Sequence, residues 1–172
     1  MMKKTLLATA LMAGTTAALA EISGNVAMVS DYRFRGVSQT DGQIAIQGGF
    51  DYEHDSGFYV GTWASNIDSN FFGGSTDPQI ELDLYAGYGF EIANGIGLDL
   101  GVAQYFYPGS SNNFSSPSPS DPETTELYLG ASFGDLSSKL YYSNELAFIA
   151  SSESAWYLNA GYETTLPVYG IG

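Results

Sequence analysis

The sequence contains no cysteine, a single histidine and only five basic residues. Without cysteine the chain has neither a disulfide framework nor a thiolate metal site. His54 has no second histidine to join it in a zinc site, and a Ser-His-acid triad would have to use this one imidazole. We therefore expect no cofactor, no metal site and no catalytic residue.

Positive charge is also scarce, and the formal net charge is −14. Two of the five bases, Lys3 and Lys4, lie at the extreme N-terminus. From residue 21 onward only Arg33, Arg35 and Lys139 oppose all 19 acidic residues, so this part of the chain carries −16. So acidic a chain repels nucleic acid and anionic surfaces. We expect no nucleic-acid partner.

No apolar run of about eighteen residues follows residue 20, which argues against a membrane-spanning helix in that part. The first twenty residues, by contrast, combine a positive start, "MMKK", with the apolar stretch "TLLATALMAGTTAALA". That stretch ends in an A-x-A sequence, as secretory signal peptides do. We predict a signal peptide over 1–20, cleaved before Glu21, and one exported domain over 21–172.

Aromatic residues and glycine are abundant, with 13 Tyr, 10 Phe and 21 Gly, and polar and apolar residues alternate along most of the chain. In "QIELDLYAGYGFEI" (79–92) the apolar residues occupy one face of a strand and the acids occupy the other. The segments 43–54, 96–107 and 123–134 show the same pattern. Alternation of period two is typical of β-strands with one polar and one apolar face.

Short and long links alternate between these segments. "HDSG" (54–57), "ANG" (93–95) and "GDLS" (134–137) have the composition of tight hairpin turns, whereas 36–42 and 108–122 are longer links. The pattern predicts an all-β fold, an antiparallel up-and-down transmembrane β-barrel with about eight strands. A soluble β-sandwich also alternates and remains the competing interpretation.

The stretch "VSDYRFRGVSQTDG" (29–42) contains two of the three basic residues after residue 20. If one strand runs from about Ile22 to Arg35, its alternation sends Tyr32 and Phe34 toward lipid, in the aromatic girdle of a barrel. The same alternation sends Asp31, Arg33 and Arg35 into the lumen, near a constriction.

The acidic residues on the polar face would line the lumen, and an excess of one charge in a narrow passage favours ions of the opposite sign. Alternatively, the arginines only balance acids in a filled interior. Glu81 and Asp83 could act as the paired carboxyls of a glycosidase only if they lay in a substrate cleft. On a strand they are better explained as residues that line the lumen. Tyrosines beside glycines, including Tyr85, Tyr105, Tyr128 and Tyr141, are interpreted as wall packing. The pore-lining candidates are Asp31, Arg33, Arg35, Asp51, Glu53, Glu81, Asp83, Glu91, Asp99, Glu126 and Glu145.

Residues 26–68, from "VAMVSDYRFRGVSQ" to "WASNID", and "ELDLYAGY" (81–88) resemble the TorF family, which is classed with porins by analogy and is also called Gcw_chp. The resemblance implies an outer-membrane β-barrel of a Gram-negative bacterium with a pore role and no catalytic residues. Members of the family run longer and close on a terminal strand that ends in an aromatic residue. The end "TTLPVYGIG" departs from this, so one interpretation is a C-terminally truncated chain with strand number and closure left open.

We expect an outer-membrane porin that allows passive diffusion of ions or small polar solutes, with a preference for cations. Its partners would be outer-membrane lipid, the outer-membrane assembly machinery and small solutes or cations. A second hypothesis is a closed barrel that acts as a surface or adhesion protein through its loops, chiefly 108–122 around Phe114. A secreted soluble β-sandwich is the third.

Overall fold

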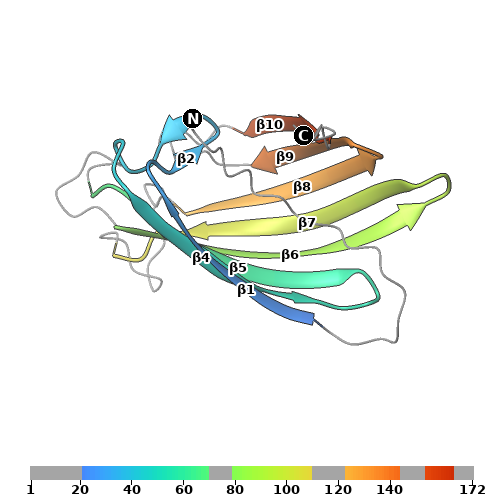
Figure 1. Cartoon of the computed structure of the whole chain (residues 1–172), viewed down its shortest axis with the longest axis horizontal. Coiled ribbons are helices and arrows are strands. Elements are labelled where there is room, and N and C mark those ends of the chain that lie inside the picture. Colours follow the sequence, from blue (N-terminus) through green and yellow to red (C-terminus); the bar gives the residue numbers. More distant parts are fainter. Residues whose placement is uncertain (1–20, 70–78, 110–122, 144–153, 165–172) are drawn as a thin grey trace, which may run out of the picture.

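The computed structural model of the chain describes residues 21–69, 79–109, 123–143 and 154–164. Within these residues the fold is all-β, and eight strands form one antiparallel sheet in the order β1-β4-β5-β6-β7-β8-β9-β10 (Figure 1). Two further short strands, β2 and β3, pair only with each other. The predicted signal peptide, residues 1–20, lies outside the described residues. The strands are β1 (Glu21–Val29), β2 (Arg33–Phe34), β3 (Val37–Ser38), β4 (Ala45–Glu53), β5 (Phe58–Asn66), β6 (Ile80–Ile92), β7 (Ile96–Phe106), β8 (Thr124–Phe133), β9 (Leu136–Ser143) and β10 (Ala155–Tyr162).

The strands of the large sheet follow one another as a meander. The three short turns predicted from composition join β4 to β5, β6 to β7 and β8 to β9, all at one end of the sheet. Asn94 and Gly95 both have positive φ, 70° and 75°, within the three-residue turn that joins the paired residues Ile92 and Ile96. We call this end of the sheet the turn end and the opposite one the loop end. The predicted antiparallel strands and short turns are therefore confirmed.

Closure of the barrel is not seen in the structure. β1 and β10 lie at the two edges of the sheet, and no pairing joins them within the described residues. The sheet is twisted and curved rather than flat (Figure 1). In the described part of the chain there is no helix long and apolar enough to cross a membrane.

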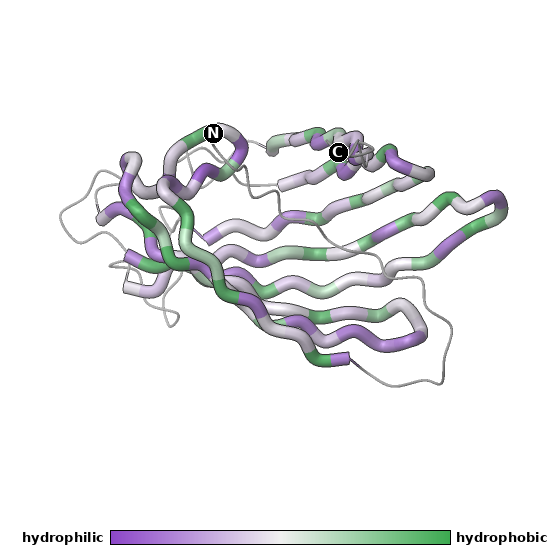
Figure 2. The backbone as a smooth tube through the Cα atoms, in the orientation of Figure 1, coloured by the Kyte–Doolittle hydropathy of each residue, from purple (hydrophilic) through white to green (hydrophobic). Residues whose placement is uncertain are grey.

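The two faces of the sheet differ sharply in chemistry, and hydrophilic and hydrophobic residues alternate along the strands (Figure 2). One face is apolar and exposed, with side chains such as Val26, Phe50, Leu100 and Leu129 open to the surroundings. The other face carries acids, tyrosines and glycines, and among its buried residues are Glu81 and Glu126. This is the reverse of a soluble protein, in which apolar side chains are covered. We call the two faces the apolar face and the polar face.

The predicted first strand from Ile22 to Arg35 is wrong, because β1 ends at Val29. The chain then turns back through β2 and β3, which form a small hairpin. Arg35 and Gly36 have φ of 50° and 89°, and such left-handed residues end the alternation of an extended strand. We call residues 31–40 the inner hairpin, since it packs on the polar face.

Tyr32 and Phe34 therefore do not face lipid, and this prediction is also wrong. Tyr32 is buried with Ala45, Ile67 and Tyr107 in the one buried hydrophobic cluster found among the described residues, and Phe34 packs against that cluster. The Tyr32 hydroxyl reaches a carboxylate acceptor on the polar face, which a lipid-facing ring could not do.

Candidate functional site: the polar face beneath the inner hairpin

The inner hairpin is stabilised by hydrogen bonds around Asp31. Oδ1 of Asp31 accepts from the hydroxyls of Ser38, at 2.5 Å, and Thr40, at 3.2 Å. Its Oδ2 lies 2.6 Å from Nε of Arg33. These contacts, with the Ser38 hydrogen bond foremost, hold the pKa of the Asp31 carboxyl below its ordinary value. Asp31 thus organises the hairpin and does not line an open passage.

Arg35 fastens the inner hairpin to the wall of the sheet. Its Nη1 and Nη2 donate to the two oxygens of Glu126 on β8, at 2.8 and 2.6 Å. Its guanidinium carbon lies 5.0 Å from the ring centre of Tyr141 on β9 and 4.3 Å from that of Tyr157 on β10. Bidentate pairing and stacking on aromatic rings are geometries that a lysine could not reproduce.

All three basic residues after residue 20 are paired with acids. Arg33 contacts Asp31 and is exposed, with 60% of its side chain accessible, whereas the Arg35 partner Glu126 is only 4% accessible. Lys139 on β9 lies 2.6 Å from Asp99. The arginines are therefore not equivalent: Arg35 is packed in the interior, and Arg33 stays at the surface of the inner hairpin.

Tyrosine rings cover glycines on neighbouring strands across the polar face. Tyr59 lies opposite Gly87, and Tyr128 lies opposite Gly101. A β-carbon built on Gly101 would stand 2.2 Å from the hydroxyl of Tyr128, so the ring occupies the space that a side chain would need. Tyr85 covers Gly61 in the same way, so the interpretation as wall packing is confirmed for Tyr85 and Tyr128.

The tyrosine hydroxyls are joined to the acids of the polar face. Tyr59 donates to Asp99 at 2.6 Å, and its oxygen lies 2.6 Å from the hydroxyl of Tyr128. Tyr85 donates to Asp51. Because Tyr59 has given its one proton to Asp99, Tyr128 is the donor in the tyrosine pair. The middle of the polar face is therefore filled by a hydrogen-bonded layer.

Beneath the inner hairpin lie two acids of β6, Glu81 and Asp83. The Tyr32 hydroxyl donates to Oε1 of Glu81 at 3.0 Å. Burial, together with the nearby carboxylates, raises the pKa of Tyr32, so this hydroxyl stays protonated and remains a donor. Glu81 and Asp83 are thus covered by the hairpin and do not face a substrate cleft, which argues against a glycosidase.

The remaining pore-lining candidates are scattered. Asp51 and Asp99 belong to the tyrosine layer. Glu53 and Glu91 lie near the turn end and are exposed. Glu145 lies outside the described residues, as does most of the proposed binding loop around Phe114. The structure brings together Arg35, Glu126, Glu81 and Asp83 beneath the hairpin, and it separates them from Glu53 and Glu91.

Two parts of this site were not predicted from the sequence. Gln39 is buried in the inner hairpin, although the sequence indicates only a longer link over 36–42. Tyr105 donates to Glu126 at 3.1 Å, next to the Arg35 contact. The turn-forming Gly36 was the one local signal that could have indicated a hairpin.

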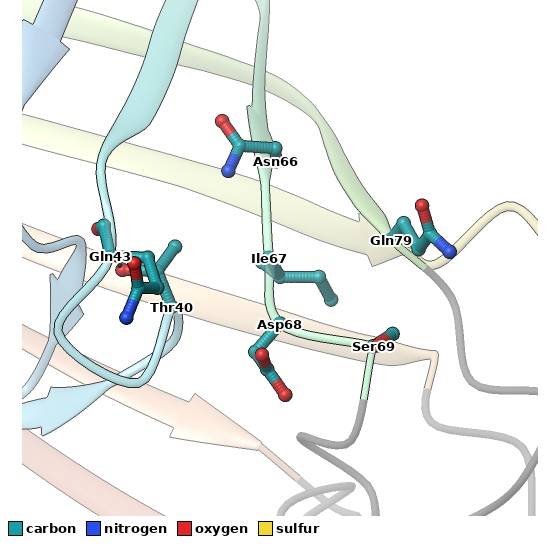
Figure 3. A pocket seen from close by; sticks show the side chains of 7 residues that line it. All are labelled: Thr40, Gln43, Asn66, Ile67, Asp68, Ser69 and Gln79. Atoms are coloured by element: carbon teal, nitrogen blue, oxygen red, sulfur yellow. Dashed lines mark hydrogen bonds between the residues drawn. The ribbon is translucent and has the colours of Figure 1, made fainter.

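A separate pocket lies at the loop end, between the inner hairpin and the ends of β5 and β6 (Figure 3). Its volume is about 230 Å³, and its lining is mostly polar. No group of three or more Asp, Glu, His or Cys side chains gathers into a metal site in the parts of the chain that the structure describes. The lining residues are Thr40, Gln43, Asn66, Ile67, Asp68, Ser69 and Gln79.

Comparison with known proteins adds a family and no function. Neither the curated proteins nor the solved structures contain a match to the chain. Residues 13–172 match the family described as "bacterial protein of unknown function (Gcw_chp)". The match covers nearly the whole chain, including every strand of the sheet. The chain therefore belongs to the Gcw_chp family of bacterial proteins.

Proposed function

We propose that the chain forms an outer-membrane β-barrel of the TorF type, which lets cations and small polar solutes diffuse passively through its interior. The observation that carries this proposal is the inverted sheet, with an exposed apolar face and a covered, charged face. Lipid-facing and lumen-facing residues alternate in this way along transmembrane β-strands. A soluble sandwich would instead bury its apolar face against a second sheet.

Contacts of the inner hairpin support a sheet that curls into a barrel. Residues 32–35 alone contact every strand from β5 to β10. In a flat sheet these six strands would extend over about 24 Å, whereas the backbone of four residues reaches at most about 14 Å, and less here because Arg35 is left-handed. Curvature of the polar face around the hairpin accounts for this set of contacts.

Closure then follows from the cost of exposing backbone groups to lipid. Among the described residues, the outer edges of β1 and β10 have no neighbouring strand. Each unpaired peptide group costs several kcal/mol, on the order of a lost hydrogen bond, in the hydrocarbon. We infer that the two edges are joined in the membrane, either to each other or through further strands. The barrel would reach the outer membrane through the periplasm, with the help of the assembly machinery.

Cation preference follows from the charge balance of the interior. Each of Arg33, Arg35 and Lys139 is offset by one acid, so the remaining carboxylates are in excess. A passage lined by excess negative charge concentrates cations. The inner hairpin, fastened by Arg35, would be the constriction.

The experiment is single-channel recording of the refolded chain in a planar bilayer with a KCl gradient. Discrete conductance steps with a reversal potential on the cation-selective side are expected, and a heat-unfolded sample serves as the control. A protein that inserts but does not conduct would overturn the pore and favour the closed surface barrel. A protein that stays in solution without detergent would overturn the membrane location itself.

A further inference from the structure

Side chains from four neighbouring strands gather around the guanidinium of Arg35. Glu126 on β8 accepts two hydrogen bonds from it, at 2.8 and 2.6 Å. Tyr141 on β9 and Tyr157 on β10 lie opposite each other in the sheet, and the guanidinium carbon lies 5.0 and 4.3 Å from their ring centres. Tyr105 on β7 donates to the same carboxylate at 3.1 Å. The wall of the sheet thus supplies a carboxylate and two rings, and the inner hairpin supplies the cation.

This set of groups suits a guanidinium better than other cations. A carboxylate that accepts two parallel N–H bonds matches the planar fork of a guanidinium, whose flat faces also stack on aromatic rings. An alkylammonium is a compact, strongly hydrated point charge and does not combine the two contacts. The side chain of Glu126 is only 4% accessible, so water competes little for its oxygens. The wall therefore distinguishes a chemical class as well as a sign of charge.

The tip of the inner hairpin, residues 33–37, is largely open to solvent. Arg33 and Val37 are exposed, and a β-carbon built on Gly36 would have no atom within 4 Å. The ion pair and ring contacts of Arg35 attach this tip to β8, β9 and β10. Arg35 has φ of 50°, an unfavourable conformation for a non-glycine residue that release of its side chain would relieve.

The base of the hairpin is attached independently of Arg35. The Tyr32 hydroxyl donates to Glu81 at 3.0 Å, and the Tyr32 ring lies in the buried hydrophobic cluster. The carbonyl of Gln39 accepts from the backbone N–H of Asp68 at 2.8 Å. Loss of the Arg35 contacts would therefore free the tip and leave the base in place.

We propose that Glu126, Tyr141 and Tyr157 form a guanidinium-binding site in which Arg35 is a tethered occupant, and that guanidinium-bearing solutes exchange with Arg35. This inference rests on the proposed function, because it names the class of cation that the passage would select. A solute guanidinium in place of Arg35 keeps the carboxylate of Glu126 paired while the tip of the hairpin moves away. One cation replaces another, so the exchange leaves no buried charge uncompensated.

The test is equilibrium dialysis of the full chain in zwitterionic detergent micelles, with L-arginine as the probe and L-lysine as a control of equal charge. Arg35→Ala removes the tethered occupant. This variant should bind a single arginine per chain, and lysine at least about tenfold more weakly, since lysine lacks the bidentate fork. Arg35→Ala/Glu126→Gln should lose the arginine. Equal binding of the two amino acids, or arginine binding that survives the Glu126 substitution, would overturn the site.

The wild-type protein tests the exchange itself. Its own Arg35 competes with the added arginine, so the apparent affinity should fall in proportion to the fraction of molecules with a vacant site. Arg33→Ala is the matched control and should bind arginine as the wild type does, because Arg33 is exposed on the other side of the tip. Wild-type protein that binds arginine no better than lysine would overturn the exchange. This comparison decides alone if Arg35→Ala does not fold.

Failure of the site is distinct from failure of the proposed pore, because dialysis in micelles needs no membrane. A chain that conducts ions in a planar bilayer but binds no arginine would overturn the guanidinium site alone. A chain that binds arginine through Glu126 but does not conduct would support the site and overturn the pore.

Discussion

Arg35 and Glu126, 91 residues apart in the sequence, form a bidentate ion pair that joins the inner hairpin to β8. Glu126 is almost inaccessible, so removing its partner leaves a buried, unpaired charge. Arg35→Gln should therefore lower the free energy of unfolding by about 3–5 kcal/mol. Urea unfolding in detergent micelles measures this change.

Arg33 provides the matched control for Arg35. Its ion pair with Asp31 is exposed, and such pairs contribute about 0–1 kcal/mol. Arg33→Gln should thus leave the urea concentration at the midpoint of unfolding nearly unchanged. The double variant Arg35→Gln/Glu126→Gln should be less destabilised than Arg35→Gln alone, since no charge is left unpaired. If the Arg33 and Arg35 variants lose equal free energy of unfolding, the Arg35–Glu126 pair does not stabilise the fold more than an exposed ion pair does.

A second prediction concerns the tyrosine layer. Gly101→Ala places a methyl group 2.2 Å from the Tyr128 hydroxyl and 2.6 Å from the backbone oxygen of Ala86, so the ring must move. We expect the free energy of unfolding to fall by about 1–3 kcal/mol, the usual cost of overpacking. Gly89→Ala is the control, because its nearest neighbour would be 3.9 Å away. If both variants unfold at the same urea concentration, Tyr128 does not pack as described.

Local signals predicted the sheet well. Period-two alternation in 79–92 and 96–107 corresponds to β6 and β7, and turn residues such as Asn94 and Gly95 mark the hairpin between them. These features depend on neighbouring residues, so one sequence is sufficient to find them. The separation of a polar and an apolar face follows from the same alternation.

The inner hairpin could not be predicted in the same way. Residues 31–35 alternate like a strand in sequence, but the chain bends at Ser30 and Asp31 and turns at Arg35, whose left-handed backbone non-glycine residues rarely adopt. Its anchor, Glu126, lies on a strand far along the chain. Which acid meets which base depends on the strand order and register, which a single sequence does not specify.

A third prediction tests the lipid-facing role of the apolar face. Leu100 is 47% exposed in the middle of β7, and its side chain would lie in the hydrocarbon. Leu100→Arg should cost about 2–4 kcal/mol in a phospholipid bilayer, as arginine does near the midplane of transmembrane barrels. Asn159→Arg, on the polar face of β10, should cost much less. Equal stability of the two variants in vesicles would contradict a lipid-exposed apolar face.

The last prediction uses the hydrogen bonds at Asp31, which lies outside the strands. The Ser38 hydroxyl, above all, holds the pKa of this carboxyl below its ordinary value of 3.8. Because the pKa of Asp31 is lower in the folded state, its carboxylate stabilises the hairpin at pH values above the ordinary pKa. This contribution is lost as the pH falls through the folded-state pKa. The inner hairpin should therefore loosen only below about pH 4, near the ordinary pKa of an aspartate.

Limited proteolysis by pepsin, which works in this range, would detect cleavage near Gly36 in the wild-type protein as the pH decreases. Asp31→Asn carries no carboxylate at this position, so the cleavage rate of its hairpin, divided by that of an unfolded reference peptide at the same pH, should not change with pH. A decrease in pH that leaves wild-type cleavage unchanged would show that the Asp31 contacts do not hold the hairpin. A pH response that persists in Asp31→Asn would assign it to another carboxyl.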